Sequence, residues 1–310
     1  MKPNKKRKKM GRGKTIFYWS ILAFPLLQFI IFYVGVNLNS FALAFQKFDY
    51  SGNGYTFVGF ENLFQNFLDV FKEFQEAKYL QTAVWNSVLV FILGLVIGLS
   101  LGLLFSYYIY KKCALSKFYK TILFLPYIIS SITLVIIYKY FVEQAVPEVV
   151  LKLFNIEMDG LLSNQNTEFG AILFFTIWTG FGVQTLIYSS SMSGISNEIV
   201  EAAKMDGITP LKEFLFIDIP IIAPTISVFV VSSVATLFVN QMNLFNFYGA
   251  EAPYGIYTIG YYIYRGVSAA GTTLSDYPYY AAFGLVMTMI TIPITLIVRK
   301  VMNKLDPNEG

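Results

Sequence analysis

The fold class is decided by VLVFILGLVIGLSLGLLF, residues Val88–Phe105, because this stretch runs for 18 residues without a charged side chain. The hydrocarbon core of a bilayer is about 30 Å thick, and a helix crosses it with roughly 20 mostly apolar residues. Lipid offers the backbone no hydrogen-bond partners, so such a segment satisfies its own peptide groups as a helix. The stretch therefore predicts a membrane-spanning helix.

Similar apolar runs occur throughout the chain. With the first included, they lie near residues 16–38, 84–108, 121–141, 169–190, 222–247 and 280–301. The 310 residues are 55% hydrophobic and only 14% charged, far from the balance of a soluble domain. The alternation expected of a membrane β-barrel is absent. We predict an all-α polytopic membrane protein with six transmembrane helices in a lipid bilayer.

The basic residues predict the orientation of these helices. Residues 1–15 form a basic tail without an acidic residue, and further basic residues lie at 111–120, 204–212 and 299–304. Basic residues concentrate on the cytoplasmic side of a membrane, so both termini are predicted to be cytoplasmic. The run that follows the tail is too long for the apolar part of a signal peptide. Topology accounts for the tail, so no nucleic-acid partner is expected.

The residues needed for soluble-style catalysis are scarce. The chain has no histidine and a single cysteine, Cys113, which removes the commonest general base and zinc ligand. Gly13-Lys14-Thr15 lacks the earlier glycine of a phosphate-binding loop, because position 8 is Lys8. We expect no catalytic site, no metal site and no enzyme activity in this chain.

Neutral polar side chains are the candidate binding groups within the predicted spans. Hydroxyls and amides exchange hydrogen bonds with a polyhydroxylated solute without a fixed charge. The alternative is that they hold helices together, and Gly94, Gly98 and Gly102 also predict close helix packing. The candidate solute-binding residues are Tyr127, Ser131, Thr176, Gln184, Ser232, Thr236, Asn240 and Gln241.

Residues 191–221 have the pattern of two short helices joined by a glycine corner. Ser196 is a predicted N-cap, and Gly207 is suited to the left-handed position that ends the first helix. Thr209-Pro210 predicts the start of a second helix that runs to about Ile217. Pro220 and Pro224 are then expected to close this helix and begin the next span.

This segment carries a family resemblance. Glu201-Ala202-Ala203-Lys204-Met205-Asp206-Gly207, followed by Phe214 and Asp218-Ile219-Pro220, resembles the EAA loop of bacterial ABC importer permeases. Asn39-Ser40-Phe41 and Asn86-Ser87 resemble the sugar-type branch, which includes the maltose and glycerol-phosphate permeases. Glu251-Ala252-Pro253 departs from the usual Gly-Gly-Pro of that branch.

The resemblance implies an ABC type I importer permease fold in a bacterial cytoplasmic membrane. It implies a permease domain over 16–310 with its core at 80–301, and a cytoplasmic coupling loop at 191–221. The implied partners are a second homologous permease, ABC ATPase subunits that bind the ATP and magnesium, an extracellular solute-binding protein and a carbohydrate substrate. No cofactor is expected in this chain itself.

The resemblance also assigns residues. The implied ATPase-coupling residues are Glu201, Ala202, Ala203, Asp206, Gly207 and Pro220, and the implied pathway adds Gly180 to the polar residues above. Two alternatives remain at this point: an ABC permease for a solute other than a sugar, and an ion-coupled secondary transporter. An anionic solute needs arginine or lysine side chains in the cavity. An ion-coupled transporter needs an ion site formed by backbone carbonyls and neutral side chains.

Overall fold

The computed structural model describes residues 11–52, 54–60, 64–268 and 273–305, so most of the predicted basic tail lies outside the described residues. Helices make up nearly all of the described secondary structure, which confirms the predicted all-α class. The chain divides into two compact units. The first unit ends at Val70 and also includes Thr273–Leu285, and the second contains the remainder.

The first unit contains a long helical run and a small hairpin. The run consists of α1 (Arg12–Gln28), a π-helical turn (Phe29–Gly35) and α2 (Val36–Leu43). Strands β1 (Gln46–Asp49) and β2 (Gly54–Phe57) pair antiparallel, an addition to the all-α prediction. The Asn66 side chain, near the start of α3 (Gln65–Glu76), donates hydrogen bonds to the carbonyls of Ala44 and Gln46 at 2.7 and 2.9 Å. These bonds hold the hairpin against α3.

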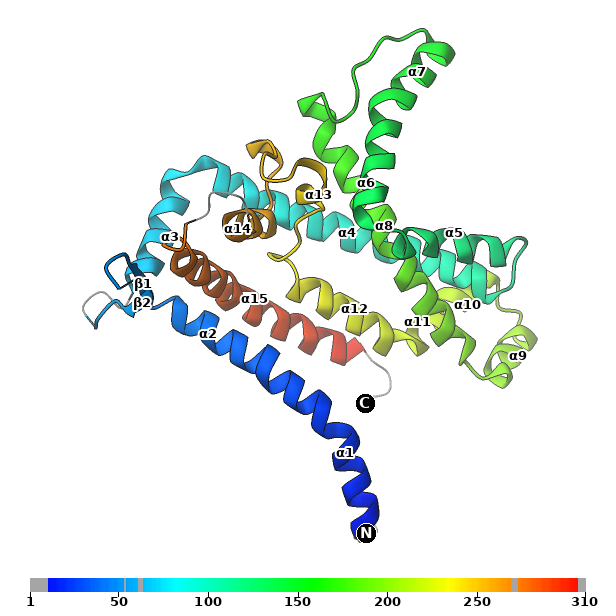
Figure 1. Cartoon of the computed structure of the whole chain (residues 1–310). Coiled ribbons are helices and arrows are strands. Elements are labelled where there is room, and N and C mark those ends of the chain that lie inside the picture. The colour runs from blue at the N-terminus through cyan, green and yellow to red at the C-terminus, as the bar shows by residue number, and fades with distance from the viewer. Residues whose placement is uncertain (1–10, 53, 61–63, 269–272, 306–310) are drawn as a thin grey trace. The chain divides into compact units, whose positions relative to one another are not determined.

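The second unit is organised by two long helices, α4 (Lys78–Tyr110) and α8 (Gln165–Ser193), which pack together. Helices α5 (Ser116–Ile128), α6 (Ser131–Tyr140) and α7 (Val146–Phe154) lie between them in sequence, with a π-helical turn (Phe141–Ala145) between α6 and α7. In Figure 1, α8 runs from the end near α6 and α7 to α9 (Asn197–Met205).

The rest of the second unit contains shorter helices. Helix α10 (Pro210–Glu213), a π-helical turn (Phe214–Asp218) and α11 (Ile219–Ile221) form one helical run before α12 (Ala223–Ala235). Helix α13 (Leu244–Tyr248), a 3₁₀ turn (Tyr254–Ile256) and α14 (Ile259–Ser268) follow. The last helix, α15 (Tyr277–Leu305), contributes its residues from Val286 onward to this unit.

The six predicted spans correspond to four long helices and two bent pairs. Among the described residues, four helices are long and apolar enough to cross a membrane: Gly13–Leu43, Lys78–Tyr110, Gln165–Ser193 and Tyr277–Lys304. The other two candidates are Ser116–Ile128 with Ser131–Phe154, bent by 107°, and Pro210–Ile221 with Ala223–Ala235, bent by 71°.

The predicted spans near 121–141 and 222–247 are interrupted by bends. The backbone leaves the helical region at Ile129 and Ser130, which separate α5 from α6, and the Ser130 side chain makes no capping hydrogen bond. Helix α12 ends at Ala235, and the turns after it contain Met242 and Asn243 in the left-handed region. Apolarity alone does not require a continuous helix, because irregular backbone is tolerated at membrane depth where it lines a cavity.

A buried polar pair joins α4 to the 3₁₀ turn before α14 and to the first residue of α14. The Asn86 amide donates to the carbonyls of Gly255 and Tyr257, both at 2.9 Å, and the Ser87 hydroxyl accepts from the Ile259 backbone N–H at 2.9 Å. Both side chains are buried, so these bonds satisfy groups that are costly to leave unpaired.

Candidate functional site

The first helix of the coupling segment, defined here as residues 191–221, ends as its sequence predicts. The Ser196 side chain accepts a hydrogen bond from the Glu198 N–H at 3.2 Å, which caps the start of α9. At the other end Gly207 has φ +75°, its N–H bonds to the Lys204 carbonyl, and the Ile208 N–H bonds to the Ala203 carbonyl. This is a Schellman motif, which reverses the chain sharply after α9.

Helix α9 presents the predicted coupling residues to solvent. Glu201, Ala202, Asp206 and Gly207 are exposed, and Ala203 is half-buried. Met205 lies among them with 90% of its surface exposed, and sequence reasoning did not single it out. The face therefore combines two carboxylates from the helix, Glu198 and Glu201, with small side chains and an exposed thioether, and it is open to contact with another protein.

The opposite side of the coupling segment is anchored in a hydrophobic cluster, here called the loop cluster. Its buried members come from α4, α8, the coupling segment, the corner at Ile222 and α12: Leu103, Tyr188, Met192, Ile195, Val200, Phe214, Ile222, Ile226 and Val230. Val200 is the buried residue of α9, so its side chain anchors the helix while Glu201 and Ala202 stay exposed. The cluster packs the coupling segment against α4, α8 and α12.

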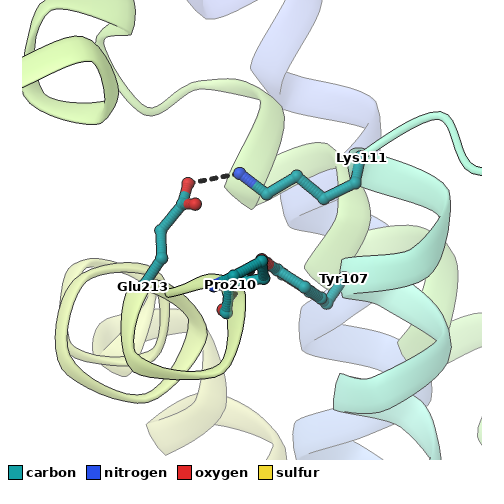
Figure 2. A network of polar contacts seen from close by, with 4 residues as sticks. All are labelled: Tyr107, Lys111, Pro210 and Glu213. Atoms are coloured by element: carbon teal, nitrogen blue, oxygen red, sulfur yellow. Dashed lines mark hydrogen bonds and ion pairs between the residues drawn. The ribbon is translucent and has the colours of Figure 1, made fainter. Parts of the chain in front are cut away.

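Polar contacts tie α10 to the end of α4, as Figure 2 shows. The Lys111 ammonium forms an ion pair with Glu213, and the Tyr107 hydroxyl donates to the Pro210 carbonyl at 2.9 Å. The Tyr107 ring also lies 4.8 Å from that of Phe214, between centroids. In the sequence, Lys111 is one of several basic residues that indicate topology, and nothing nearby in the chain points to its pairing with Glu213. We call these four contacting side chains and the Pro210 carbonyl the α4–α10 latch.

The second helix of the coupling segment is longer than predicted. It does not stop near Ile217 but continues through the π-helical turn to Ile221, so Pro220 lies within it. The 71° corner falls at Ile222, whose backbone leaves the helical region between the two prolines. Asp218 is fully buried, and its carboxylate oxygens have no hydrogen-bond partner among the described residues.

A cavity of ≈ 170 Å³ lies between α4, α8 and the end of α12. Five of the predicted pathway residues line it: Thr176, Gly180, Gln184, Thr236 and Asn240. Gly94 and Gly98 of α4 also line it, and a Cβ added at either position meets no atom within 4 Å, whereas Gly102 packs against Tyr188 and Gln184. The glycine stripe therefore serves packing at Gly102 and opens the cavity at the other two positions.

The cavity offers hydrogen-bonding groups and no ionisable side chain among its described lining residues. The Thr176 and Thr236 hydroxyls donate to carbonyls of their own helices, at 2.9 Å to Ile172 and 3.1 Å to Ser232, and their oxygens can still accept. The side-chain oxygen of Asn240, Oδ1, accepts a hydrogen bond from the Met242 N–H at 2.8 Å, which leaves the side-chain NH₂ group of Asn240 to donate. The wall therefore suits a neutral polar solute.

A second cavity of ≈ 360 Å³ lies where the predicted fifth span is interrupted. Asn240 lines both cavities, and Gln241, Asn243, Asn246 and Tyr264 line this one. Ser131 borders the same group, because its hydroxyl accepts from the Asn246 amide at 3.3 Å. The turns after α12 thus gather carboxamides that a continuous helix distributes around its circumference.

Two predicted pathway residues lie elsewhere. Tyr127 is 67% exposed on α5, and Ser232 is exposed on α12, and neither lines these two cavities. Ser233, the next residue, faces the first cavity instead. Both residues are polar and adjacent within an apolar helix, so the sequence offers no signal that separates them.

The chain matches known transport proteins. Residues 92–309 match the family described as binding-protein-dependent transport system inner membrane component. A probable ABC transporter permease of Mycoplasma pneumoniae (MG188 homolog) is 28% identical over 169 residues, covering 53% of this chain and only 50% of that protein. The arabinooligosaccharides transport system permease AraP of Bacillus subtilis is 23% identical over 281 residues, covering 88% and 84% of the two chains.

The fold matches a solved transporter over nearly its whole length. The crystal structure of a bacterial alginate ABC transporter, in complex with a periplasmic protein bound to an alginate pentasaccharide, contains a chain with a TM-score of 0.73 to this one. The two chains are 19% identical, and the match covers 95% of this chain and 96% of the other. This likeness confirms the predicted importer permease fold.

Proposed function

The chain belongs to the family of binding-protein-dependent transport system inner membrane components, and from that membership we propose that it is the permease subunit of an ATP-driven ABC importer for a neutral carbohydrate. It is a transport subunit and not an enzyme. The observation that carries the carbohydrate proposal is the cavity between α4, α8 and α12, whose polar lining consists of hydroxyls and carboxamides.

The charge of the solute follows from the same lining. AraP is named for arabinooligosaccharide transport, and the solved transporter carries the acidic polysaccharide alginate. A buried site for an anionic sugar needs a cation or several aligned N–H donors, because an unpaired charge is expensive to remove from water. The described lining has no such cation. A neutral sugar or oligosaccharide is the substrate that this wall fits.

The proposed partners follow from the family and from the exposed face of α9. Transport that depends on a binding protein supports an extracellular solute-binding protein as one partner. The exposed surface around Glu201 and Met205 supports docking of an ABC ATPase, which binds the ATP and magnesium, and a second permease completes the pathway. The basic residues support a topology with residues 191–221 and both termini in the cytoplasm. An ion-coupled transporter is not favoured, because it needs no binding protein.

The proposed mechanism is alternating access driven through α9. The loop cluster packs α9 against α4, α8 and α12, and the same three helices line the cavity at a different level. The α4–α10 latch adds a second attachment to α4. A movement of α9 with the ATPase is therefore passed to the cavity walls as a rigid-body motion, and not absorbed by a flexible loop.

Co-purification from the native membrane tests the assembly. We expect an ATPase and a second permease to accompany the wild-type chain, and Glu201→Lys to lose the ATPase while still inserting into the membrane. Glu251→Lys is the matched control, since Glu251 is an exposed carboxylate outside the coupling segment. Isolation of the chain without an ATPase contradicts the proposal.

Uptake into proteoliposomes tests the substrate class. The complex, reconstituted with its binding protein, is expected to accumulate neutral oligosaccharides upon ATP hydrolysis and to leave acidic oligosaccharides outside. Selective uptake of acidic oligosaccharides contradicts the assignment of a neutral substrate, although it leaves the permease assignment intact.

A further inference from the structure

A third cavity, of ≈ 620 Å³, lies between the end of α4, the start of α5 and the last turns of α8. Three lysines line it: Lys112, Lys117 and Lys120. Serine hydroxyls from α5 and α8 form much of the remaining polar wall, and none of the described lining residues is acidic. Its volume falls within the range of roughly 300–1,000 Å³ that is usual for small-ligand sites.

The lysines converge because of the corner between α4 and α5. Lys112 and Leu115 both have left-handed backbone, with φ of 52° and 59°, and the chain reverses between them. Lys117 and Lys120 are three residues apart on α5, so they share one face of that helix. The neighbouring Lys111 turns instead to Glu213, which separates the two adjacent lysines into different environments.

The three positive charges have no protein counter-charge in the described part of the chain. The ion pairs found there join Lys111 to Glu213 and Lys152 to Glu148. Like charges held in one cavity repel each other, and an anion in the cavity relieves this repulsion. A phosphate also accepts hydrogen bonds from ammonium and hydroxyl groups together, which matches the lysine and serine lining.

Helix α5 also carries an exposed apolar face beyond the residues that line this cavity. Phe118, Ile122 and Leu125 follow the spacing of one helix face, and all three are exposed. Leu115 and Leu186 add apolar wall to the cavity itself. A free phosphate has no use for this surface, whereas the acyl chain of a lipid covers it. Tyr110 also lines the cavity, and tyrosine is enriched at the level of lipid headgroups.

We propose that this cavity binds the phosphate headgroup of an anionic phospholipid, with an acyl chain along the exposed face of α5. The proposal rests on the topology proposed above, in which the corner between α4 and α5 faces the cytoplasm, where basic pockets between membrane helices meet anionic lipids. The orientation of the helices in the membrane depends only on how many basic residues lie on the cytoplasmic side. It does not explain why three of them line one cavity with hydroxyls.

Lipid retention during purification provides the test. The full chain, with the subunits that accompany it, is reconstituted in nanodiscs of phosphatidylcholine with a minor fraction of phosphatidylglycerol, released, and examined by native mass spectrometry. We expect the wild type to retain phosphatidylglycerol. The triple variant Lys112→Gln/Lys117→Gln/Lys120→Gln is expected to lose retention by about fivefold for each charge removed.

Three controls make the result specific. Arg299→Gln/Lys300→Gln/Lys304→Gln removes the same number of basic residues from exposed positions of α15 outside this cavity, and it is expected to retain the lipid. Replacement of the three cavity lysines by arginine keeps the charge and is expected to preserve retention, which separates charge loss from misfolding. Excess inorganic phosphate is expected to leave the lipid bound.

The contrary outcomes are equally definite. Equal loss in both glutamine triple variants assigns retention to general surface charge and overturns the proposal, as does displacement of the lipid by inorganic phosphate. Loss of a protein subunit instead of lipid from the cavity variant shows that a protein occupies the site. The measurement needs no transport activity, so phosphatidylglycerol retention by a chain that recruits no ATPase refutes the proposed function and leaves this inference standing.

Discussion

Replacing Gly182 with alanine places a methyl group where α8 touches the backbone of α5. A Cβ at this position lies 1.9 Å from the carbonyl oxygen of Leu123 and 2.9 Å from its carbonyl carbon. Both are backbone atoms, so no side-chain rotation relieves the overlap. The two helices must separate by roughly 1 Å to reach the 3.0 Å below which such contacts are essentially never seen.

The energetic consequence follows from two opposing effects. Overpacking of a tight contact costs about 1–3 kcal/mol and more where backbone must move. Alanine gains at most about 1 kcal/mol over glycine from its helix propensity. The steric cost therefore exceeds the gain, and we expect Gly182→Ala to lower the thermal unfolding temperature of the detergent-solubilised complex and to reduce its yield.

Gly180→Ala is the matched control on the same helix. Gly180 has no atom within 4 Å of an added Cβ, and it lines the ≈ 170 Å³ cavity. This variant is expected to keep or raise the unfolding temperature while the narrower cavity slows solute uptake. A wild-type unfolding temperature for Gly182→Ala, or an equal loss for both variants, refutes the reasoning that α5 approaches α8 at Gly182.

Three further predictions concern the coupling segment and the cavity. Lys111→Met removes the cation beside Glu213, whose side chain is 5% exposed. We expect thermal unfolding to show that the free energy of unfolding falls by about 3–5 kcal/mol, and that Glu213→Gln in the same chain partly restores it. Gly207→Val forces a β-branched residue to φ +75°, at a cost of roughly 1–2 kcal/mol, and is expected to weaken ATPase co-purification while Gly207→Asn retains most of it. Asn240→Asp puts a charge into the neutral cavity, and uptake of a neutral oligosaccharide is expected to fall with little change in unfolding temperature.

Each of these predictions has a contrary result. An unchanged unfolding temperature for Lys111→Met shows that the ion pair contributes little to stability. Equal ATPase co-purification by the valine and asparagine variants at position 207 shows that the left-handed corner is not needed for docking. Undiminished uptake by Asn240→Asp places the solute elsewhere.

Features that depend on consecutive residues could be predicted without the structure. The length of an apolar run is enough to predict a membrane helix, because the thickness of the bilayer sets that length. The caps of α9 are equally local: Ser196 bonds two residues ahead, and Gly207 adopts a backbone conformation that its missing Cβ allows. The ends of α9 and the helical class could therefore be predicted from the chain alone.

The packing of distant segments sets which face of each helix lines a cavity and which contacts another helix. Within an apolar span every face is compatible with lipid or with another helix, so periodicity does not separate Ser232 from Ser233, or Gly180 at a cavity from Gly182 at a helix contact. The α4–α10 latch joins Lys111 to Glu213, 102 positions apart in the chain. Such pairings, and the bends that gather the carboxamides after α12, arise from contacts between distant segments, which no local pattern of residues records.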